Sequence, residues 1–91
     1  MYKIYYIYDI RNKDTILYVG STKHGIRRRF NQYKKIKEKF SELTNYLNND
    51  GKYNCFISLI GEFNDDIDRY SREAMWILYL NPKFNKYRRY G

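Results

Sequence analysis

Two short apolar runs near the start of the chain alternate side chains with the period of β-strands. The first covers residues 3–10 and the second covers residues 16–20, and both are rich in β-branched and aromatic side chains. Only the polar residues 11–15 separate the two runs, and that segment is too short to hold a helix. The pattern therefore predicts a β-hairpin.

The hairpin is predicted to bring two tyrosines to one face of a sheet. If the strands are joined by a two-residue turn, Tyr5 lies opposite Tyr18, and a register shifted by two residues still keeps both phenols on the same face. On the second strand, Ile16, Tyr18 and Gly20 are expected to share a face.

The middle of the chain changes to helical spacing. From residue 23 to residue 40, apolar side chains recur at i, i+4, i+7, i+10 and i+14, which predicts an amphipathic helix with its basic residues on the outer face. A second helix is predicted over residues 41–49, with Ser41 as its N-cap. The apolar residues 53–63 then indicate a third, more buried strand.

A third helix is predicted after an acidic group formed by Asp65, Asp66 and Asp68. Carboxylates in a first turn cap unpaired N–H groups, so we interpret this group as capping residues rather than as a metal site. The helix is predicted to end at Leu80, before Asn81-Pro82. Its predicted inner face consists of Ile67, Tyr70, Ala74, Ile77 and Leu78.

The length and composition of the chain limit the classes of function that it can have. The chain has 91 residues, enough for one small domain with a single core, and its net charge of +8 indicates a polyanionic partner. Nucleic acid fits better than a membrane surface, because the sequence has no long apolar run.

Cys55 is the only cysteine, which excludes a disulfide framework and a cysteine-based zinc site within one chain. With no visible signal peptide, we expect an intracellular location, and the abundance of Lys, Asn, Ile, Tyr and Phe is typical of a virus, a phage or a low-GC bacterium.

The positive charge is concentrated in residues 23–40, which contain eight Lys or Arg residues against Glu38 alone. A solvated helix face is the simpler explanation, but so many uncompensated cations repel one another, which favours phosphate binding. His24 in the preceding loop has no second metal-type ligand beside it, so we interpret it as an exposed residue rather than a proton shuttle. The predicted nucleic-acid-binding residues are Lys23, His24, Arg27, Arg28, Lys34 and Lys35.

Two motifs at opposite ends of the chain resemble one family. Ile4-Tyr5, followed thirteen positions after the tyrosine by Tyr18-Val19-Gly20, is similar to the signature of GIY-YIG endonucleases, with Lys3 in place of the first glycine. Glu73, an apolar run and then Pro82-Lys83-Phe84-Asn85 resemble the metal-binding glutamate of that family and its Pro-Lys-Tyr-Asn-like turn. The resemblance covers nearly the whole chain in the right order.

The resemblance implies a single nuclease domain over residues 1–91, with an α+β fold. A three-stranded, mainly antiparallel sheet would be flanked by three helices in the order ββααβα. The implied activity is metal-dependent hydrolysis of DNA phosphodiester bonds. Mg²⁺, or another divalent ion such as Mn²⁺, would be held by Glu73 and by phosphate oxygens.

The resemblance also implies roles for individual residues. Tyr5, helped by Tyr18, would orient or deprotonate the attacking water, and Arg29 would stabilise charge in the transition state. Lys3 and Arg29 would supply the positive field needed to lower the Tyr5 pKa. For Tyr33, one helical turn after Arg29, the residues alone favour a ring packed in the core, whereas the resemblance gives it an assisting role. The implied catalytic set is Tyr5, Tyr18, Arg29, Tyr33, Glu73 and Asn85.

Two other classes of function remain open. One is a degenerate family member that binds nucleic acid without cutting it, suggested by Lys3, and the other is a small basic RNA-binding protein. Retention of a carboxylate at Glu73 argues against both, because pure binding of a polyanion has no need of it. DNA is the expected partner, and target specificity would come from the domain itself, from a homodimer or from a partner protein.

Overall fold

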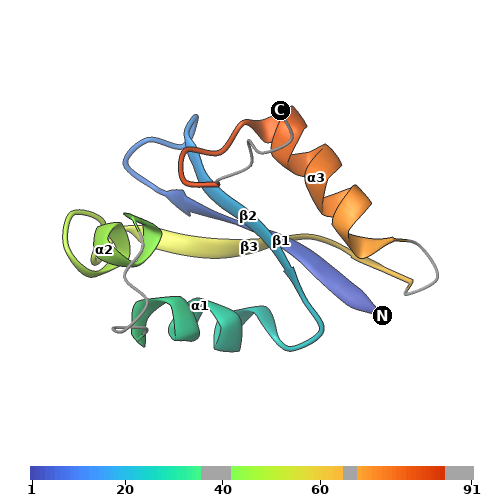
Figure 1. Ribbon diagram of the computed structural model, residues 1–91. Coiled ribbons are helices and arrows are strands. Elements are labelled where there is room, and N and C mark those ends of the chain that lie inside the picture. Colours follow the sequence, from blue (N-terminus) through green and yellow to red (C-terminus); the bar gives the residue numbers. More distant parts are fainter. Residues whose placement is uncertain (36–41, 65–67, 86–91) are drawn as a thin grey trace.

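Three strands and three helices follow one another in the order ββααβα in the computed structural model, which describes residues 1–35, 42–64 and 68–85 (Figure 1). The elements are β1 (Tyr2–Asp9), β2 (Ile16–Thr22), α1 (Ile26–Lys35), α2 (Glu42–Asn48), β3 (Cys55–Phe63) and α3 (Arg69–Leu80). The predicted α+β fold and order of elements are confirmed.

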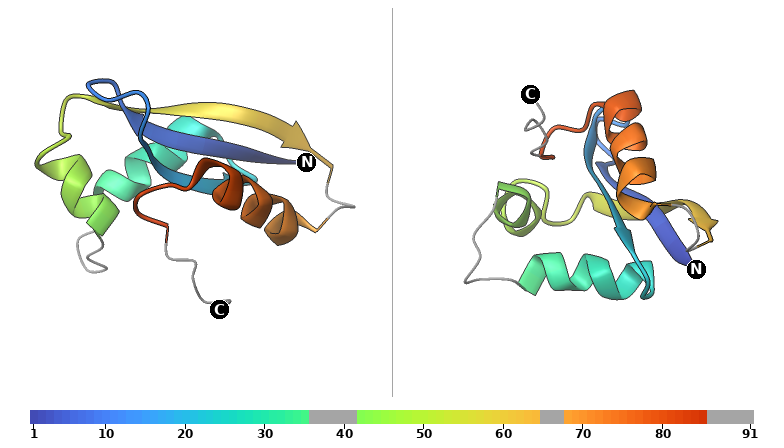
Figure 2. Two further views of the ribbon diagram at one scale, coloured as in Figure 1. Left: turned by 90° about the horizontal axis from the view of Figure 1, so that it is seen from above. Right: turned by 45° about the vertical axis from the view of Figure 1, so that its right-hand side comes forward.

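The sheet is built around its first strand. Its order is β2-β1-β3, and β1 pairs antiparallel with both neighbours. Helices α1 and α2 cover one face and α3 covers the other, as both views of Figure 2 show. Because β1 has a strand on each side and helices above and below, four of its side chains are completely buried. They are Tyr2, Ile4, Tyr5 and Ile7.

The hairpin register differs from the prediction by two residues. Tyr5 pairs with Gly20, and Ile7 pairs with Tyr18. The connection is longer than a two-residue turn, because residues 10–15 contain two successive turns closed by backbone hydrogen bonds. The prediction that the Tyr5 and Tyr18 side chains share a face is confirmed, since a shift of two residues preserves the face.

A bulge in β2 explains a second difference between the predicted and the observed hairpin. The register passes from Ile7 opposite Tyr18 to Tyr8 opposite Ile16, which leaves Leu17 as an extra residue. Leu17 packs in the core beside Ile7, whereas Ile16 packs against the core on the other face. The prediction that Ile16 shares a face with Tyr18 is therefore wrong.

The third strand is more exposed than predicted. β3 begins at Cys55 and pairs with β1 alone, so it forms an edge of the sheet. Phe56 and Leu59 are 45% and 43% exposed, which contradicts the expectation of a buried strand. An edge position accounts for this exposure, because the helices cover the centre of the sheet more completely than its rim.

A buried carboxylate ties the end of β1 to α2. Asp9 is only 3% exposed and accepts hydrogen bonds from the Arg11 guanidinium and from the Tyr46 hydroxyl, the latter at 2.6 Å. These hydrogen bonds hold the pKa of Asp9 well below its ordinary value, and the bond from Arg11 has the largest effect. The network fixes the hairpin loop against α2, and Arg11 extends it to the backbone of Asp50.

The ends of α3 follow the predicted signals. The Asp68 side chain accepts from the Tyr70 N–H as an N-cap, and Asn81 closes the helix in the left-handed conformation, with φ of 50°. Asp65 and Asp66 lie outside the described residues, as do Ser41 and the predicted continuation of α1 over residues 36–40.

The buried side of α3 differs from the predicted one. Ile77 is buried as predicted, but Tyr70 and Leu78 are 69% and 82% exposed, and Trp76 and Leu80 pack against the sheet in their place. The helix is rotated so that a neighbouring row of side chains faces β2. In the described part of the chain no helix is long and apolar enough to cross a membrane.

Candidate active site

Three tyrosines and one arginine from three elements meet on the α1 side of the sheet. The Tyr5 and Tyr33 hydroxyl oxygens lie 2.7 Å apart, and either group can be the donor. Arg29 Nε donates to the Tyr5 hydroxyl at 3.4 Å, and the Tyr18 ring packs edge-on against Tyr33 with centroids 5.3 Å apart. The structure therefore brings together four of the six predicted catalytic residues.

Helical spacing on α1 places Arg29 beside Tyr33. The two residues are one turn apart, and the guanidinium carbon lies 5.2 Å from the centre of the Tyr33 ring. Arg29 Nη1 also donates to the side-chain oxygen of Gln32, which holds the guanidinium in place. The predicted Arg29–Tyr33 pairing is confirmed, and Tyr33 is a partly buried ring with its hydroxyl in the cluster.

Gly20 makes room for the Tyr5 phenol. A Cβ atom at Gly20 would lie 2.5 Å from the Tyr5 hydroxyl oxygen and 3.0 Å from Tyr18 Cε2. Because Tyr5 and Gly20 are paired across the hairpin, the phenol lies directly against the β2 backbone. Any larger residue at this position would displace it.

The phenols are neutral in this site. Burial is the largest effect on Tyr5 and raises its pKa above the ordinary value, although the hydrogen bonds from Tyr33 and Arg29 act in the opposite direction. Burial likewise raises the pKa values of Tyr18 and Tyr33. The hydrogen bond to Tyr5 raises the pKa of Arg29. Arg29 lowers the Tyr5 pKa as expected, but the expected net lowering is wrong for the protein without bound substrate, because desolvation outweighs the neighbouring charge.

Glu73 approaches the phenols from α3. The Ser21 hydroxyl donates to Glu73 Oε1 at 2.7 Å, and the carboxylate is partly buried at the edge of the helix. Its negative charge adds to the effect of burial in raising the Tyr18 pKa. Sequence reasoning missed Ser21. The sequence feature that could have pointed to Ser21 is its position immediately after Gly20, on the strand that carries Tyr18.

Asn85 holds the backbone of β2 rather than pointing freely into solvent. Its side-chain oxygen accepts from the Val19 N–H and its amide nitrogen donates to the Val19 carbonyl, both at 2.9 Å. The preceding residues extend this contact, because the Lys83 and Phe84 N–H groups donate to the carbonyls of Ile16 and Leu17. We name this set of bonds between residues 83–85 and β2 the C-terminal clasp. It fixes the strand that carries Tyr18 and Gly20.

The donor set suits a weakly held hard cation. Among the described residues, no three His, Cys, Asp or Glu side chains are grouped closely enough to hold a metal ion together. Mg²⁺ commonly uses one or two carboxylates and completes its shell with waters and substrate phosphates. Glu73, with the Ser21 hydroxyl beside it, fits that mode of binding.

The predicted nucleic-acid-binding residues are spread around α1 and the loop before it. His24 is exposed, as expected, and its N–H donates to the Thr22 hydroxyl oxygen. Arg27 and Lys34 line a groove between α1 and β3. The other three, Lys23, Arg28 and Lys35, are exposed.

The geometry and a family comparison lead to the same assignment. A family model described as the GIY-YIG catalytic domain matches residues 2–88, nearly the whole chain. Comparisons with curated proteins and with solved structures gave no match. The family match includes the hairpin with Tyr5 and Tyr18, the helix with Arg29 and Tyr33, and the helix with Glu73. The chain belongs to the GIY-YIG family, whose members are nucleases.

Proposed function

We propose that the protein is a divalent-metal-dependent endonuclease that hydrolyses phosphodiester bonds of DNA. The observation that carries the proposal is the hydrogen-bonded cluster of Tyr5, Tyr33 and Arg29 beside a carboxylate, Glu73, that Ser21 holds in place. A site for binding alone would have no use for a carboxylate in a protein of net charge +8, because it repels phosphate.

Tyr5 is the residue suited to position the attacking water. Its hydroxyl is fixed by Tyr33 and by Arg29 Nε, and its raised pKa keeps it protonated at neutral pH. Tyr5 is completely buried without substrate, so its contact with the attacking water would form as DNA binds. There a fixed neutral phenol can exchange hydrogen bonds with the water molecule and hold one of its lone pairs toward phosphorus. Tyr18 and Tyr33 restrict the phenol from the sides of β2 and α1.

Arg29 is the residue suited to stabilise the negative charge that develops on the phosphoryl oxygens. Its guanidinium is held by Tyr5, by the Tyr33 face and by Gln32, so little reorganisation is needed when the charge forms. A planar guanidinium also matches phosphate geometry with two parallel N–H groups.

Glu73 would hold Mg²⁺ or Mn²⁺ together with phosphate oxygens of the bound DNA. When bound, a divalent ion supplies charge stabilisation at the phosphate and at the leaving oxygen. Ser21 keeps the carboxylate oriented, and Asn85 keeps Tyr18 and Gly20 in position through the C-terminal clasp. Asn85 is thus proposed as a positioning residue rather than as a phosphate ligand.

Glu73→Gln tests the proposal. The substitution preserves size and helix propensity but removes the charge that would hold the metal, so cleavage of supercoiled plasmid in Mg²⁺ should fall by roughly 10³-fold. Affinity for DNA, measured by fluorescence anisotropy in EDTA, should be retained or increase, because a charge that repels phosphate is lost. Glu62→Gln is the matched control, since Glu62 is an exposed carboxylate on β3. It should cut as the parent does.

The same assay separates the other classes of function. A binding-only member would show no metal-dependent nicking of plasmid in parent or variant, and an RNA-binding protein would bind RNA in preference to DNA without cutting either. Near-parental cleavage by Glu73→Gln would place the metal site elsewhere and overturn the assignment.

A further inference from the structure

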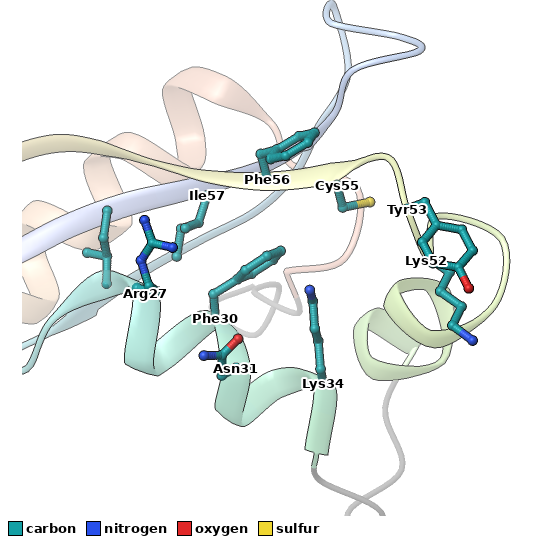
Figure 3. A pocket seen from close by; sticks show the side chains of 10 residues that line it. Arg27, Phe30, Asn31, Lys34, Lys52, Tyr53, Cys55, Phe56 and Ile57 are labelled. Carbon is teal, nitrogen blue, oxygen red and sulfur yellow. The ribbon is translucent and has the colours of Figure 1, made fainter.

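A groove lies between α1 and β3, and none of the four residues of the tyrosine and arginine cluster lines it. It extends to the turn that leads into β3, and it has a volume of about 500 Å³ (Figure 3). Phe30, Cys55 and Ile57 are among the residues that line it, and polar side chains of α1 and of the turn complete it. This volume is within the range of sites that take a small molecule or one or two nucleotide units.

The groove has cations on both of its walls. Arg27 and Lys34 come from α1, whereas Lys52 comes from the turn before β3 (Figure 3). None of the described residues that line it is acidic. Burial raises the pKa of Cys55 to about 11, so its thiol is also uncharged at neutral pH. The groove is therefore complementary to a phosphate-bearing chain.

The groove also offers one exposed aromatic ring, that of Tyr53. Tyr53 is 81% exposed and belongs to no helix or strand, yet its ring lines the groove and lies 5.3 Å from Lys52 Nζ. Phe30 is buried in the core beneath Lys34, whose Nζ lies 4.4 Å from the centre of the Phe30 ring, so Tyr53 supplies the accessible ring. Cations beside an accessible ring are an arrangement by which proteins bind single strands, whose bases are free to stack. In a duplex the bases are already stacked on one another, so this ring would remain unused.

We propose that this groove binds a single-stranded segment of the DNA, with phosphates on Arg27, Lys34 and Lys52 and a base stacked on Tyr53. The inference rests on the proposed function, because it defines the substrate of that nuclease as DNA in which a single strand adjoins a duplex. Both sites use α1, which contributes Arg27 and Lys34 to the groove and Arg29 and Tyr33 to the cluster, so the two sites are about one helix diameter, 10–12 Å, apart. A strand crossing α1 can thus occupy both sites.

Tyr53→Ala tests the proposal in a binding assay that needs no cleavage. Anisotropy is measured in EDTA with a labelled oligothymidylate and with a blunt duplex of equal length. Loss of a stacking ring costs about 1–3 kcal/mol per base, so affinity for the single strand should fall roughly 5- to 150-fold while duplex affinity stays within about twofold. Tyr79→Ala is the matched control, because Tyr79 is 79% exposed on α3, outside the groove. It should change neither affinity.

A second variant separates stacking from charge. Lys34→Gln with Lys52→Gln should weaken single-strand binding and reduce its salt dependence by about two counterions. If Tyr53→Ala leaves single-strand affinity unchanged, or weakens both DNAs equally, the groove does not select single strands and the proposal is overturned. Because no metal or turnover is used, a failure here is distinguishable from loss of cleavage in Glu73→Gln.

Discussion

Gly20→Ala should damage the active site with a single methyl group. The added Cβ would lie 2.5 Å from the Tyr5 hydroxyl oxygen and 2.7 Å from Cζ, whereas real Cβ contacts are essentially never shorter than 3.0 Å. The phenol must therefore retreat from 2.5 Å to at least 3.0 Å. Tyr5 is completely buried and its hydroxyl is hydrogen-bonded to that of Tyr33, so the ring cannot move aside without displacing its neighbours.

Two magnitudes follow from this displacement. Overpacking of a buried site lowers the free energy of unfolding by typically about 1–3 kcal/mol, and each kcal/mol lowers the melting temperature of a domain this size by about 4–8 °C. A catalytic group that moves by even a fraction of an ångström loses its geometry, and a 1 Å displacement can cost about 10²-fold in rate. We expect kcat for plasmid nicking to fall by roughly 10- to 100-fold.

The assay compares thermal unfolding and single-turnover cleavage for Gly20→Ala and Gly25→Ala. No atom lies within 4 Å of a Cβ built at Gly25, so that control should change the free energy of unfolding by no more than about 1 kcal/mol and leave the rate near parental. In a Tyr5→Phe background the closest atom is absent, and Gly20→Ala should cost less stability there by about 0.5 kcal/mol or more. If Gly20→Ala behaves like Gly25→Ala in both measurements, the close contact with Tyr5 does not constrain the site.

Two further predictions concern charge. Arg29→Ala should lower kcat by roughly 10²-fold or more, while Arg27→Ala, on the far side of α1, loses far less; equal losses in single-turnover cleavage would remove the special role of Arg29. The hydrogen bonds of Asp9 depress its pKa in the folded protein, so their contribution to the free energy of unfolding is complete above the unfolded pKa of about 3.9 and disappears as pH falls below it. At pH 7, Asp9→Asn should have a lower melting temperature than the parent. Between pH 5 and pH 2 its melting temperature should fall less than that of the parent, and an equal fall in both proteins would show that Asp9 is not the titrating group.

Features set by local spacing could be predicted from the sequence. The shared face of Tyr5 and Tyr18 follows from strand alternation, and the stacking of Arg29 on Tyr33 follows from one helical turn. The end of α3 follows from the residues after Leu80. These features depend on the chain only over a few residues, so no tertiary information was needed.

What depends on how elements pack could not be predicted. The bulge at Leu17 and the two turns of residues 10–15 shifted the hairpin register, and neither has a distinctive sequence pattern. Adjacent residues on a helix differ by about 100°, so several apolar rows on α3 were plausible, and only packing on the sheet shows that Trp76 and Leu80 accompany Ile77 in place of Tyr70 and Leu78. The same packing brings Glu73 to Ser21. The sign of the Tyr5 pKa shift likewise depends on its burial, which only the structure shows.

The C-terminal clasp also makes the active site depend on the order of synthesis. Asn85 holds Val19 across a sequence separation of 66 residues, whereas the hairpin that carries Tyr5 and Tyr18 leaves the ribosome first. At about 5–20 residues per second, roughly 3–13 s pass between synthesis of the two partners. During that interval a nascent chain carries both tyrosines and then Arg29, but the strand between Tyr18 and Gly20 is not yet fixed.

If the protein cuts DNA as proposed, a chain that does not yet have the clasp is expected not to cut. A chain that stops before residue 83 contains the hairpin, the basic helix and Glu73, yet it lacks every hydrogen bond of the clasp. Premature termination would then yield a fragment that retains cationic surface for DNA but has a loosened catalytic strand. Because residues 83–85 are synthesised after the hairpin, α1 and Glu73, the clasp would then protect the cell from the proposed activity during translation.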